Sequence, residues 1–237
     1  MKVEIWSDVV CPWCYIGKRR FEAALREFPH RDQVEVRWRS FELDPAARSA
    51  SPGEPGDYAG RLARKYGTSR EGAQQMLDSM TATAAAEGLE LRFDRAVAAN
   101  TLEAHQLVHL AAEHGVQDQV KERLLRAYFT EGEPVGDRAA LVRLAAEAGL
   151  PADEAARTLE EGRYASAVRA DEAEAGALGI SGVPFFVVDR RYGVSGAQPP
   201  AQLLQVLTRA WEETRPALTM AGGEDAAGAC GPDGCAV

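Results

Sequence analysis

The sequence predicts an α/β protein in which a long helical region interrupts a small β-sheet. Three observations support this fold class. Residues 2–43 have a strand–helix–strand pattern, residues 58–179 are almost entirely helical in pattern, and residues 183–211 return to strand–strand–helix. Because connections between elements are usually short, we expect the two halves of the sheet to rejoin, with the helices as a lid inserted between them.

The first three elements are defined by periodicity and by proline. Lys2–Ser7 alternates weakly and is typical of a strand. Trp13–Phe28 has the apolar spacing of an amphipathic helix, with Pro12 suited to its first turn and Pro29 at its end. Apolar and charged residues then alternate from Val34, which predicts a second strand running to Leu43.

The central region is punctuated by loop and capping signals. Residues 49–56 are rich in Ser, Pro and Gly and indicate a loop. Thr68–Glu71 resembles a capping box that opens a helix to about Glu87. Further helices are expected near 101–114, 117–130, 137–148, 152–161 and 164–178, separated by Gly115, Gly132, Gly149 and Gly162.

The last elements return to strands. Val183–Val188 is a short apolar run suited to a buried strand, and Tyr192–Ser195 follows a turn as its returning partner. Pro199 and Pro200 begin a final helix through Trp211.

These elements predict three parts. Residues 1–44 and 180–215 form a discontinuous sheet domain, residues 45–179 the inserted helical domain, and residues 216–237 a flexible tail.

Composition limits the partners and the compartment. The chain has 237 residues, 46% of them apolar, and a net charge of -9, which disfavours nucleic acids and anionic membranes as partners. We find neither a secretory signal nor a run of about 20 apolar residues, so a cytoplasmic location is expected. Clustered cysteines in a reducing compartment indicate redox chemistry or metal binding.

Cys11 and Cys14 form the motif with the most specific chemistry. A cysteine at a helix start meets free N–H groups and the positive end of the helix dipole, both of which favour the thiolate. Cys14 lies one turn later, close enough to form a disulfide. Cys11 is therefore the exposed attacking sulfur and Cys14 the more buried resolving one, beside the rigid Pro12 and the apolar Trp13. A zinc half-site or an inert packing pair are the alternatives.

Further motifs carry a resemblance to a known family. Cys11–Cys14 after a strand, with Gly182–Pro184 before a late strand, resembles the thioredoxin superfamily. The helical region between them resembles its DsbA branch. Phe41–Pro45, Asn100–His105 and Gly182–Phe186 are similar to the FrnE-type proteins of that branch, which are related to 2-hydroxychromene-2-carboxylate isomerases and kappa-class glutathione transferases. The resemblance covers about residues 1–215 and implies a thioredoxin-like fold.

The resemblance also implies roles for residues beyond the two cysteines. Pro184 is expected to be a cis proline against the cysteine pair, with the Val183 backbone binding an extended substrate by strand addition. An ordinary trans proline is the alternative. Asn100 and His105 are expected in the cleft between lid and sheet, or else as a helix cap and a satisfied helical histidine.

Two departures from the relatives affect the expected activity. Classical DsbA has Pro-His between its cysteines, and Trp13 cannot hold a thiolate as that histidine does. We therefore expect a higher Cys11 pKa and a weaker oxidant. The isomerases and transferases generally carry serine at the position of Cys11, so the cysteine pair favours dithiol–disulfide exchange. A glutathione-dependent isomerase or transferase and a client-binding, chaperone-like module remain the alternatives.

The tail and the central helices contain weaker signals. Cys230 and Cys235 flank a Pro-Asp-Gly turn and form a candidate second redox pair that could exchange with Cys11 and Cys14, or an idle pair, or part of a four-cysteine zinc site. His105 and His109 share a helical face, but Gln106 replaces the general base of a metalloprotease motif.

The remaining expectations concern tuning residues and partners. Asp8 and Lys18 could tune the sulfurs, although a solvated surface position is the simpler interpretation. Trp6 and Trp38 are expected in the core. The expected reaction needs no metal or nucleotide, because electrons pass between sulfurs. Thiol- or disulfide-containing proteins and small thiols are the expected partners, with glutathione as a redox partner, and the oligomeric state, including a homodimer, is left open.

Overall fold

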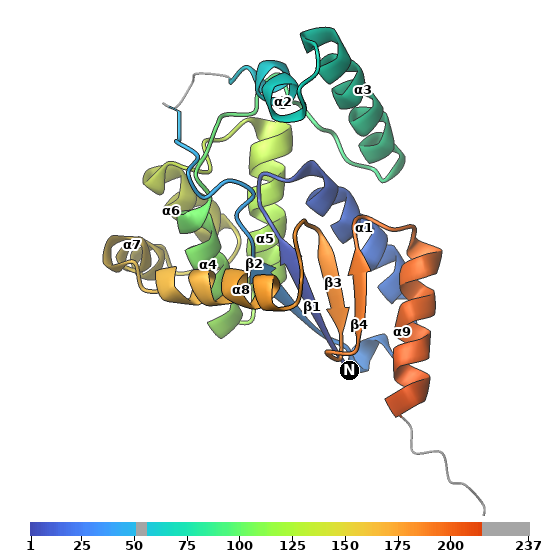
Figure 1. Ribbon diagram of the computed structural model, residues 1–237. Helices are drawn as coiled ribbons and strands as arrows, with labels where there is room; N and C mark the ends of the chain where they lie inside the picture. Colours follow the sequence, from blue (N-terminus) through green and yellow to red (C-terminus); the bar gives the residue numbers. More distant parts are fainter. Residues whose placement is uncertain (51–55, 215–237) are drawn as a thin grey trace, which may run out of the picture.

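The two ends of the described chain meet in one mixed β-sheet. The computed structural model describes residues 1–50 and 56–214. The sheet order is β2-β1-β3-β4, with β1 and β2 parallel and β3 antiparallel to both β1 and β4 (Figure 1). The strands are β1 (Lys2–Ser7), β2 (Glu35–Ser40), β3 (Phe185–Val188) and β4 (Tyr192–Ser195). The two sheet halves therefore rejoin as the sequence predicts.

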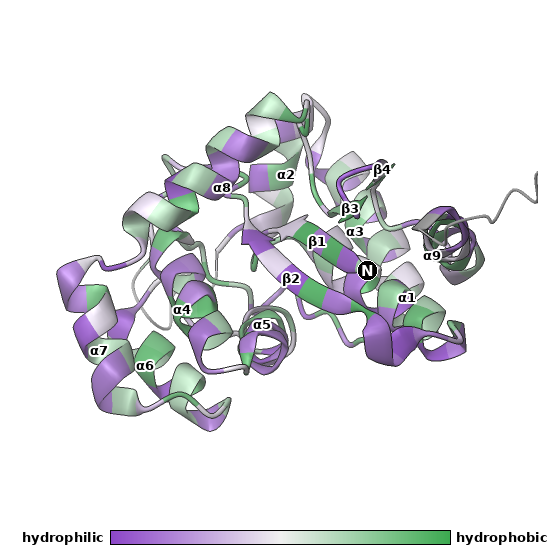
Figure 2. Ribbon diagram, turned by 90° about the horizontal axis from the view of Figure 1, so that it is seen from below, coloured by the Kyte–Doolittle hydropathy of each residue, from purple (hydrophilic) through white to green (hydrophobic). Residues whose placement is uncertain are grey.

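The helices lie in groups around this sheet. Helices α1 and α9 pack together on one side, α4, α6 and α7 lie on the other, and α2 and α3 lie above the start of α1 (Figures 1 and 2). The fold class, α/β with a helical insertion, is confirmed. The helices are α1 (Pro12–Glu27), α2 (Tyr58–Tyr66), α3 (Arg70–Ala86), α4 (Leu102–Glu113), α5 (Gln117–Arg126), α6 (Arg138–Glu147), α7 (Ala152–Glu161), α8 (Ala165–Ala177) and α9 (Pro200–Thr214).

Both faces of the sheet are buried. Side chains alternate along a strand, so Ile5 and Phe186 join the large core shared with α1 and α9. Trp6 and Val187 point to the other face and pack with Ala175 of α8. Strands β1 and β3 thus contribute apolar side chains to both faces of the sheet.

The second strand is shorter than predicted. We expected it to continue to Leu43, but β2 ends at Ser40. The Glu42 N–H donates to the Glu172 carboxylate, and the Leu43 N–H donates to Asp8 Oδ2 at 2.8 Å. Side chains thus replace the strand partner beyond Ser40, and the sheet stops there.

Two helix boundaries also differ from the prediction. The N-cap of α3 is Ser69, whose hydroxyl accepts the Gly72 N–H, and not Thr68. The helix predicted over 117–130 ends at Arg126 and continues as a π-helical turn, Ala127–Glu131. The glycines expected to separate the helices all have positive φ, a backbone region that favours glycine: Gly115, Gly132, Gly149 and Gly162.

The predicted tail and its cysteines, Cys230 and Cys235, lie outside the described residues. Among the helices that the structure describes, none has the combined length and apolar character needed to cross a membrane.

Candidate active site

The two cysteines lie where β1 passes into α1. Cys11 is the N-cap residue of α1, Pro12 occupies the first turn, and the Cys14 N–H donates to the Cys11 carbonyl oxygen at 3.0 Å. Both thiols are free. The expectation of an exposed Cys11 is wrong: only 4% of this residue is exposed, because the chain at Val183 covers it. Cys14 is the more buried of the two cysteines, with an exposed fraction of 0%.

The loop before β3 lies directly against this pair. The Cys11 thiol donates to the Val183 carbonyl oxygen at 3.6 Å, and the Val183–Pro184 peptide bond is cis. The Val183 N–H has no partner among the described residues. Pro184 also packs on Gly17 of α1, where an added Cβ would lie 2.8 Å from Pro184 Cγ. Glycine at position 17 therefore allows the helix and the loop to approach closely.

The pKa values of the two thiols move in opposite directions. The hydrogen bond to Cys14, together with burial, raises the pKa of Cys11 well above that of an ordinary thiol. Burial also opposes ionisation of Cys14. The hydrogen bond from Cys11 and the positive charge of Lys121 outweigh that cost and lower the pKa of Cys14. Cys14 is therefore the thiol that loses the first proton of the pair, and Cys11 keeps its proton to a higher pH.

Three buried polar residues lie near the pair: the charges of Asp8 and Lys121 act on the thiols, and His105 contacts Asp8. His105 Nε2 lies 3.3 Å from Asp8 Oδ1, and Lys121 Nζ donates to the Ser7 carbonyl oxygen at 3.4 Å. Burial lowers the pKa of Lys121 despite the nearby Cys14 and Asp8 charges. Burial likewise lowers the pKa of His105, so a neutral imidazole is favoured there.

The solvated positions expected for Asp8 and Lys18 are wrong. Asp8 is 1% exposed, because its carboxylate holds the chain after β2 and contacts His105. Lys18 is 2% exposed and lies among carboxylates of α1 and α5. Trp6 and Trp38 are buried in the core, as predicted.

The other candidate residues have structural contacts. Asn100 Oδ1 accepts the Leu102 N–H, and its amide donates to the Pro45 and Ala47 carbonyl oxygens. Neither Asn100 nor His105 is among the cavity-lining residues described below.

The two histidines of α4 diverge as well. His105 contacts Asp8, whereas His109 Nε2 lies 3.1 Å from Asp171 Oδ2. In residues 1–50 and 56–214, no group of three or more His, Cys, Asp or Glu side chains is arranged to hold a metal ion.

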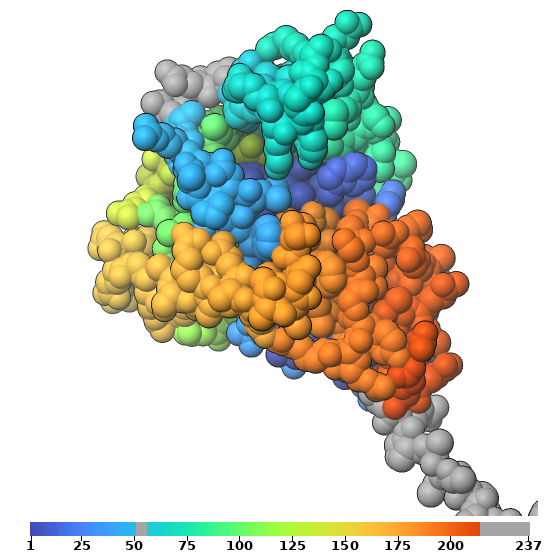
Figure 3. All heavy atoms as spheres, viewed as in Figure 1, coloured from blue at the N-terminus to red at the C-terminus, as the bar shows by residue number. Residues whose placement is uncertain are grey.

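A cavity of about 660 Å³ opens onto Cys11, and we call it the sulfur cavity. Its lining includes Cys11, Trp13 and Val183 on one side, with Leu62 and Met76 from α2 and α3 on the other. The exposed fraction of Trp13 is 40%, which makes it an apolar surface beside the sulfur. In Figure 3 the first helix is visible between α2–α3 and the segment that carries β3, so this face is not fully covered.

This geometry defines a thioredoxin-like protein: a cysteine pair at a helix start, after the first strand, beside a proline loop that precedes a later strand of the same sheet. The chain belongs to the DSBA-like thioredoxin domain family, which matches residues 2–208.

Individual relatives extend this result. A probable DsbA oxidoreductase from Streptomyces coelicolor has 49% sequence identity and a TM-score of 0.84, and the match covers 100% of this chain and 99% of that one. The uncharacterized protein YwbO of Bacillus subtilis is 28% identical over 193 residues, which are 78% of this chain and 86% of that protein.

A more distant structure shows that the fold is shared more widely. The cytosolic disulfide reductase DsbM from Pseudomonas aeruginosa, solved with GSH, has a TM-score of 0.61 at 20% identity, and the match covers 90% of this chain and 100% of that one.

Sequence reasoning missed Lys121 and Gly17. Lys121 carries a readable signal, because it lies at an apolar position of the repeat formed with Val120, Leu124 and Leu125 in α5. A lysine at a core-facing position of a helix indicates a buried charge. Gly17 lies inside a predicted helix, where glycine suggests a close backbone approach.

Proposed function

We propose that this protein is a thiol–disulfide oxidoreductase in which Cys11 attacks a disulfide and Cys14 resolves the mixed disulfide. One observation carries the proposal: two free thiols lie one turn apart at a helix start, and the outer one lines a cavity. Membership of the DsbA-like family supports the same activity.

The proposed reaction moves two electrons and needs no metal or nucleotide. The thiol proton shared by the pair shifts to Cys14, so that Cys11 attacks as the thiolate. A bond forms between Cys11 and one substrate sulfur, and the other substrate sulfur leaves as a thiolate. Cys14 then gives its proton to the departed thiolate, directly or through water, and attacks Cys11, which releases the second substrate sulfur as a thiolate and leaves a Cys11–Cys14 disulfide. The reverse sequence oxidises a substrate dithiol.

The substrate is proposed to lie beside Trp13 and the Val183 backbone. An extended peptide would pair with the free Val183 N–H, and main-chain pairing accepts many sequences. The Val183 carbonyl oxygen becomes a second acceptor for the peptide once Cys11 forms the mixed disulfide, because the sulfur then has no proton to donate to that oxygen. Glutathione is proposed as a small redox partner, supported by the DsbM structure with GSH.

Insulin-disulfide reduction by the wild type, Cys11→Ser and Cys14→Ser tests the proposal. We expect Cys11→Ser to lose at least about a thousandfold of the activity, because the attacking sulfur is gone. We expect Cys14→Ser to accumulate a mixed disulfide that mass spectrometry detects at Cys11. Full activity in Cys11→Ser would exclude the proposed mechanism.

The same single variants, together with the double variant Cys11→Ser/Cys14→Ser, separate the two alternatives. A glutathione-dependent isomerase or transferase would keep its activity in Cys14→Ser. A chaperone-like module would suppress aggregation with both cysteines replaced by serine.

A further inference from the structure

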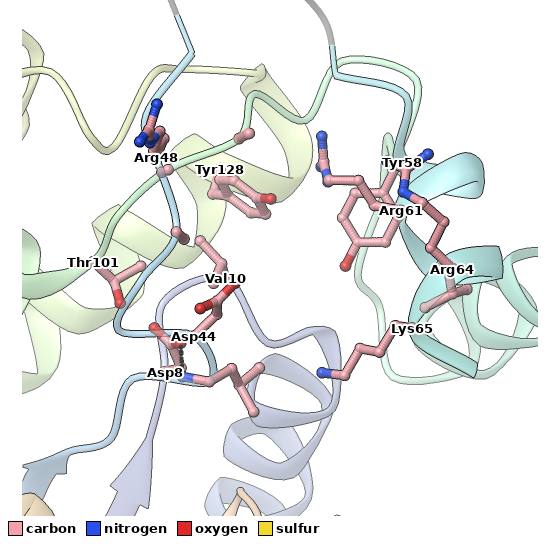
Figure 4. A pocket seen from close by; sticks show the side chains of 15 residues that line it. Asp8, Val10, Asp44, Arg48, Tyr58, Arg61, Arg64, Lys65, Thr101 and Tyr128 are labelled. Atoms are coloured by element: carbon pink, nitrogen blue, oxygen red, sulfur yellow. Dashed lines mark hydrogen bonds between the residues drawn. The ribbon is translucent and has the colours of Figure 1, made fainter. Parts of the chain in front are cut away.

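A second cavity, of about 550 Å³, is lined by an unusual number of cations. We call it the cationic cavity, and its cations are Arg48, Arg61, Arg64 and Lys65. Figure 4 shows Arg48 on one side, in the segment after β2, and the other three on the opposite side, on α2. Lys65 extends from α2 into the space between α2 and the labelled Asp8.

Among the described residues, these cations have none of the ion pairs that most of the described arginines have. Within the described residues, none of the four has a carboxylate oxygen within 4.0 Å, whereas arginines such as Arg39, Arg123 and Arg190 have two or more such contacts. The chain has a net charge of -9, so carboxylates are in excess. Several unpaired cations around one cavity are therefore unlike the rest of the surface.

The carboxylates that line the cavity already have partners. Asp8 accepts the Leu43 N–H and contacts His105, and it is 1% exposed. Asp44 Oδ1 accepts the Ala46 N–H. Four cations against two carboxylates leave an excess of positive charge in the cavity. Such a cavity attracts negatively charged groups.

The cationic cavity adjoins the sulfur cavity. A ligand can therefore place a sulfur at Cys11 and extend toward the cations past one common wall. Each cavity alone, of about 550 Å³ and about 660 Å³, is the size of a small-molecule site, since such sites typically measure about 300–1,000 Å³. The shared lining residues are Val10, Leu43, Tyr58, Leu62 and Lys65.

We propose that the cationic cavity binds the negatively charged end of a low-molecular-weight disulfide or thiol while its sulfur lies at Cys11. This inference rests on the proposed function and adds the class of substrate. The cations Arg48, Arg61, Arg64 and Lys65 select for carboxylate groups on that substrate, and neutral or cationic disulfides of the same length bind more weakly.

The reaction at this site follows the same exchange. Cys11 bonds to one sulfur of the small disulfide, and the other sulfur leaves as a thiolate that takes a proton from water. Cys14 then displaces the second sulfur. Two electrons pass from the enzyme dithiol to the substrate, and dithiothreitol, as the added dithiol, restores Cys11 and Cys14 by reducing their disulfide.

A matched series of short alkyl disulfides tests the proposal. The series is 3,3′-dithiodipropionate, 2-hydroxyethyl disulfide and cystamine, which are anionic, neutral and cationic. We expect kcat/KM of the wild type to fall in that order, with the anion favoured over the cation by about tenfold or more at low salt after correction for the uncatalysed rates. The preference should shrink as the salt concentration rises.

Two double variants identify the source of the preference. Arg48→Gln/Arg64→Gln removes two cations of the cavity, and we expect the anion preference to fall by about three- to tenfold. Arg26→Gln/Arg37→Gln changes the net charge equally, at two cations that also lack carboxylate partners in the described residues but lie away from the cavity. It should retain the wild-type preference.

The outcomes separate this inference from the proposed function. No charge preference in an active wild type, or an equal loss in both double variants, overturns the inference alone. A wild type that reduces none of the disulfides contradicts the proposed function. If the cavity variant slows insulin reduction and leaves the small-disulfide series unchanged, the cations serve a protein substrate and the inference is wrong.

Discussion

Two buried lysines at the contact between α1 and α5 have sharply different surroundings. Lys18 of α1 is 2% exposed and forms ion pairs with Glu22, Asp118 and Glu122, the last two on α5. Lys121, on α5 itself, is 1% exposed and has no carboxylate oxygen within 4.0 Å among the described residues. One lysine is surrounded by negative charge, and the other is not.

The pKa values follow from this difference. Burial lowers the pKa of Lys18, but its carboxylates outweigh burial and raise the pKa overall. Burial dominates at Lys121, where Cys14 and Asp8 compensate only in part, and the pKa falls. A buried cation without a close carboxylate costs stability, but its positive charge is not neutralised and can stabilise the Cys14 thiolate. We infer that Lys18 serves the fold and Lys121 serves the thiols.

Replacing Lys121 should give the larger effect on the chemistry. In Lys121→Met the Cys14 thiolate loses its nearby cation, so the first pKa of the thiol pair should rise by about one unit or more. At neutral pH the thiolate population and the rate of disulfide exchange should then fall about tenfold. Alkylation rates with iodoacetamide as a function of pH measure the pKa of the thiols.

Lys18→Met is the matched control for this measurement. It removes an equally buried lysine, on α1, whose charge is already balanced by carboxylates, and we expect the thiol titration to stay within about 0.3 unit of the wild type. Equal shifts in both variants would show that Lys121 has no special relation to Cys14.

Replacing Lys18 should give a smaller effect, on stability. Lys18→Met leaves the carboxylates of Glu22, Asp118 and Glu122 close together, which should cost about 1–2 kcal/mol, since these carboxylates are still partly hydrated and Arg19 still pairs with Glu122. Urea unfolding measures the free energy at neutral pH.

The stabilisation by Lys18 also has a defined pH dependence. A raised pKa in the folded state means that the contribution is complete below the unfolded value of about 10.5 and is lost as the pH rises through the folded pKa. The difference between wild type and Lys18→Met should therefore disappear in strongly alkaline solution. A difference that grows with pH would contradict this assignment.

The fold was largely predictable because its patterns are local. Apolar alternation indicated the strands, and glycines with positive φ separated the helices at positions such as Gly115 and Gly149. The end of β2 was not predictable, because the Leu43 N–H is taken by Asp8 and the Glu42 N–H by Glu172, a residue far along the chain. No local pattern reports such a partner.

The candidate site was only partly predictable for the same reason. Cys11 and Cys14 are neighbours in sequence, so spacing brings them together. Lys121 reaches their surroundings only through the packing of α5 against the sheet, and Asp8 is buried by the chain after β2. The cationic cavity likewise combines Arg48 and α2 with residues far along the chain, such as Thr101 and Tyr128. When only tertiary packing brings charged residues together, their sequence pattern is the same as that of ordinary surface residues, so the site cannot be predicted from it.

The central claim is that Cys11 and Cys14 form one reversible redox pair, and a redox titration of the full-length protein tests it most directly. The protein is equilibrated in thiol–disulfide buffers, alkylated and digested, and the peptides are identified by mass spectrometry. We predict a single two-electron transition in which the Cys11 and Cys14 peptides become joined by a disulfide. Two cysteines that stay unlinked to each other in every buffer would contradict the account.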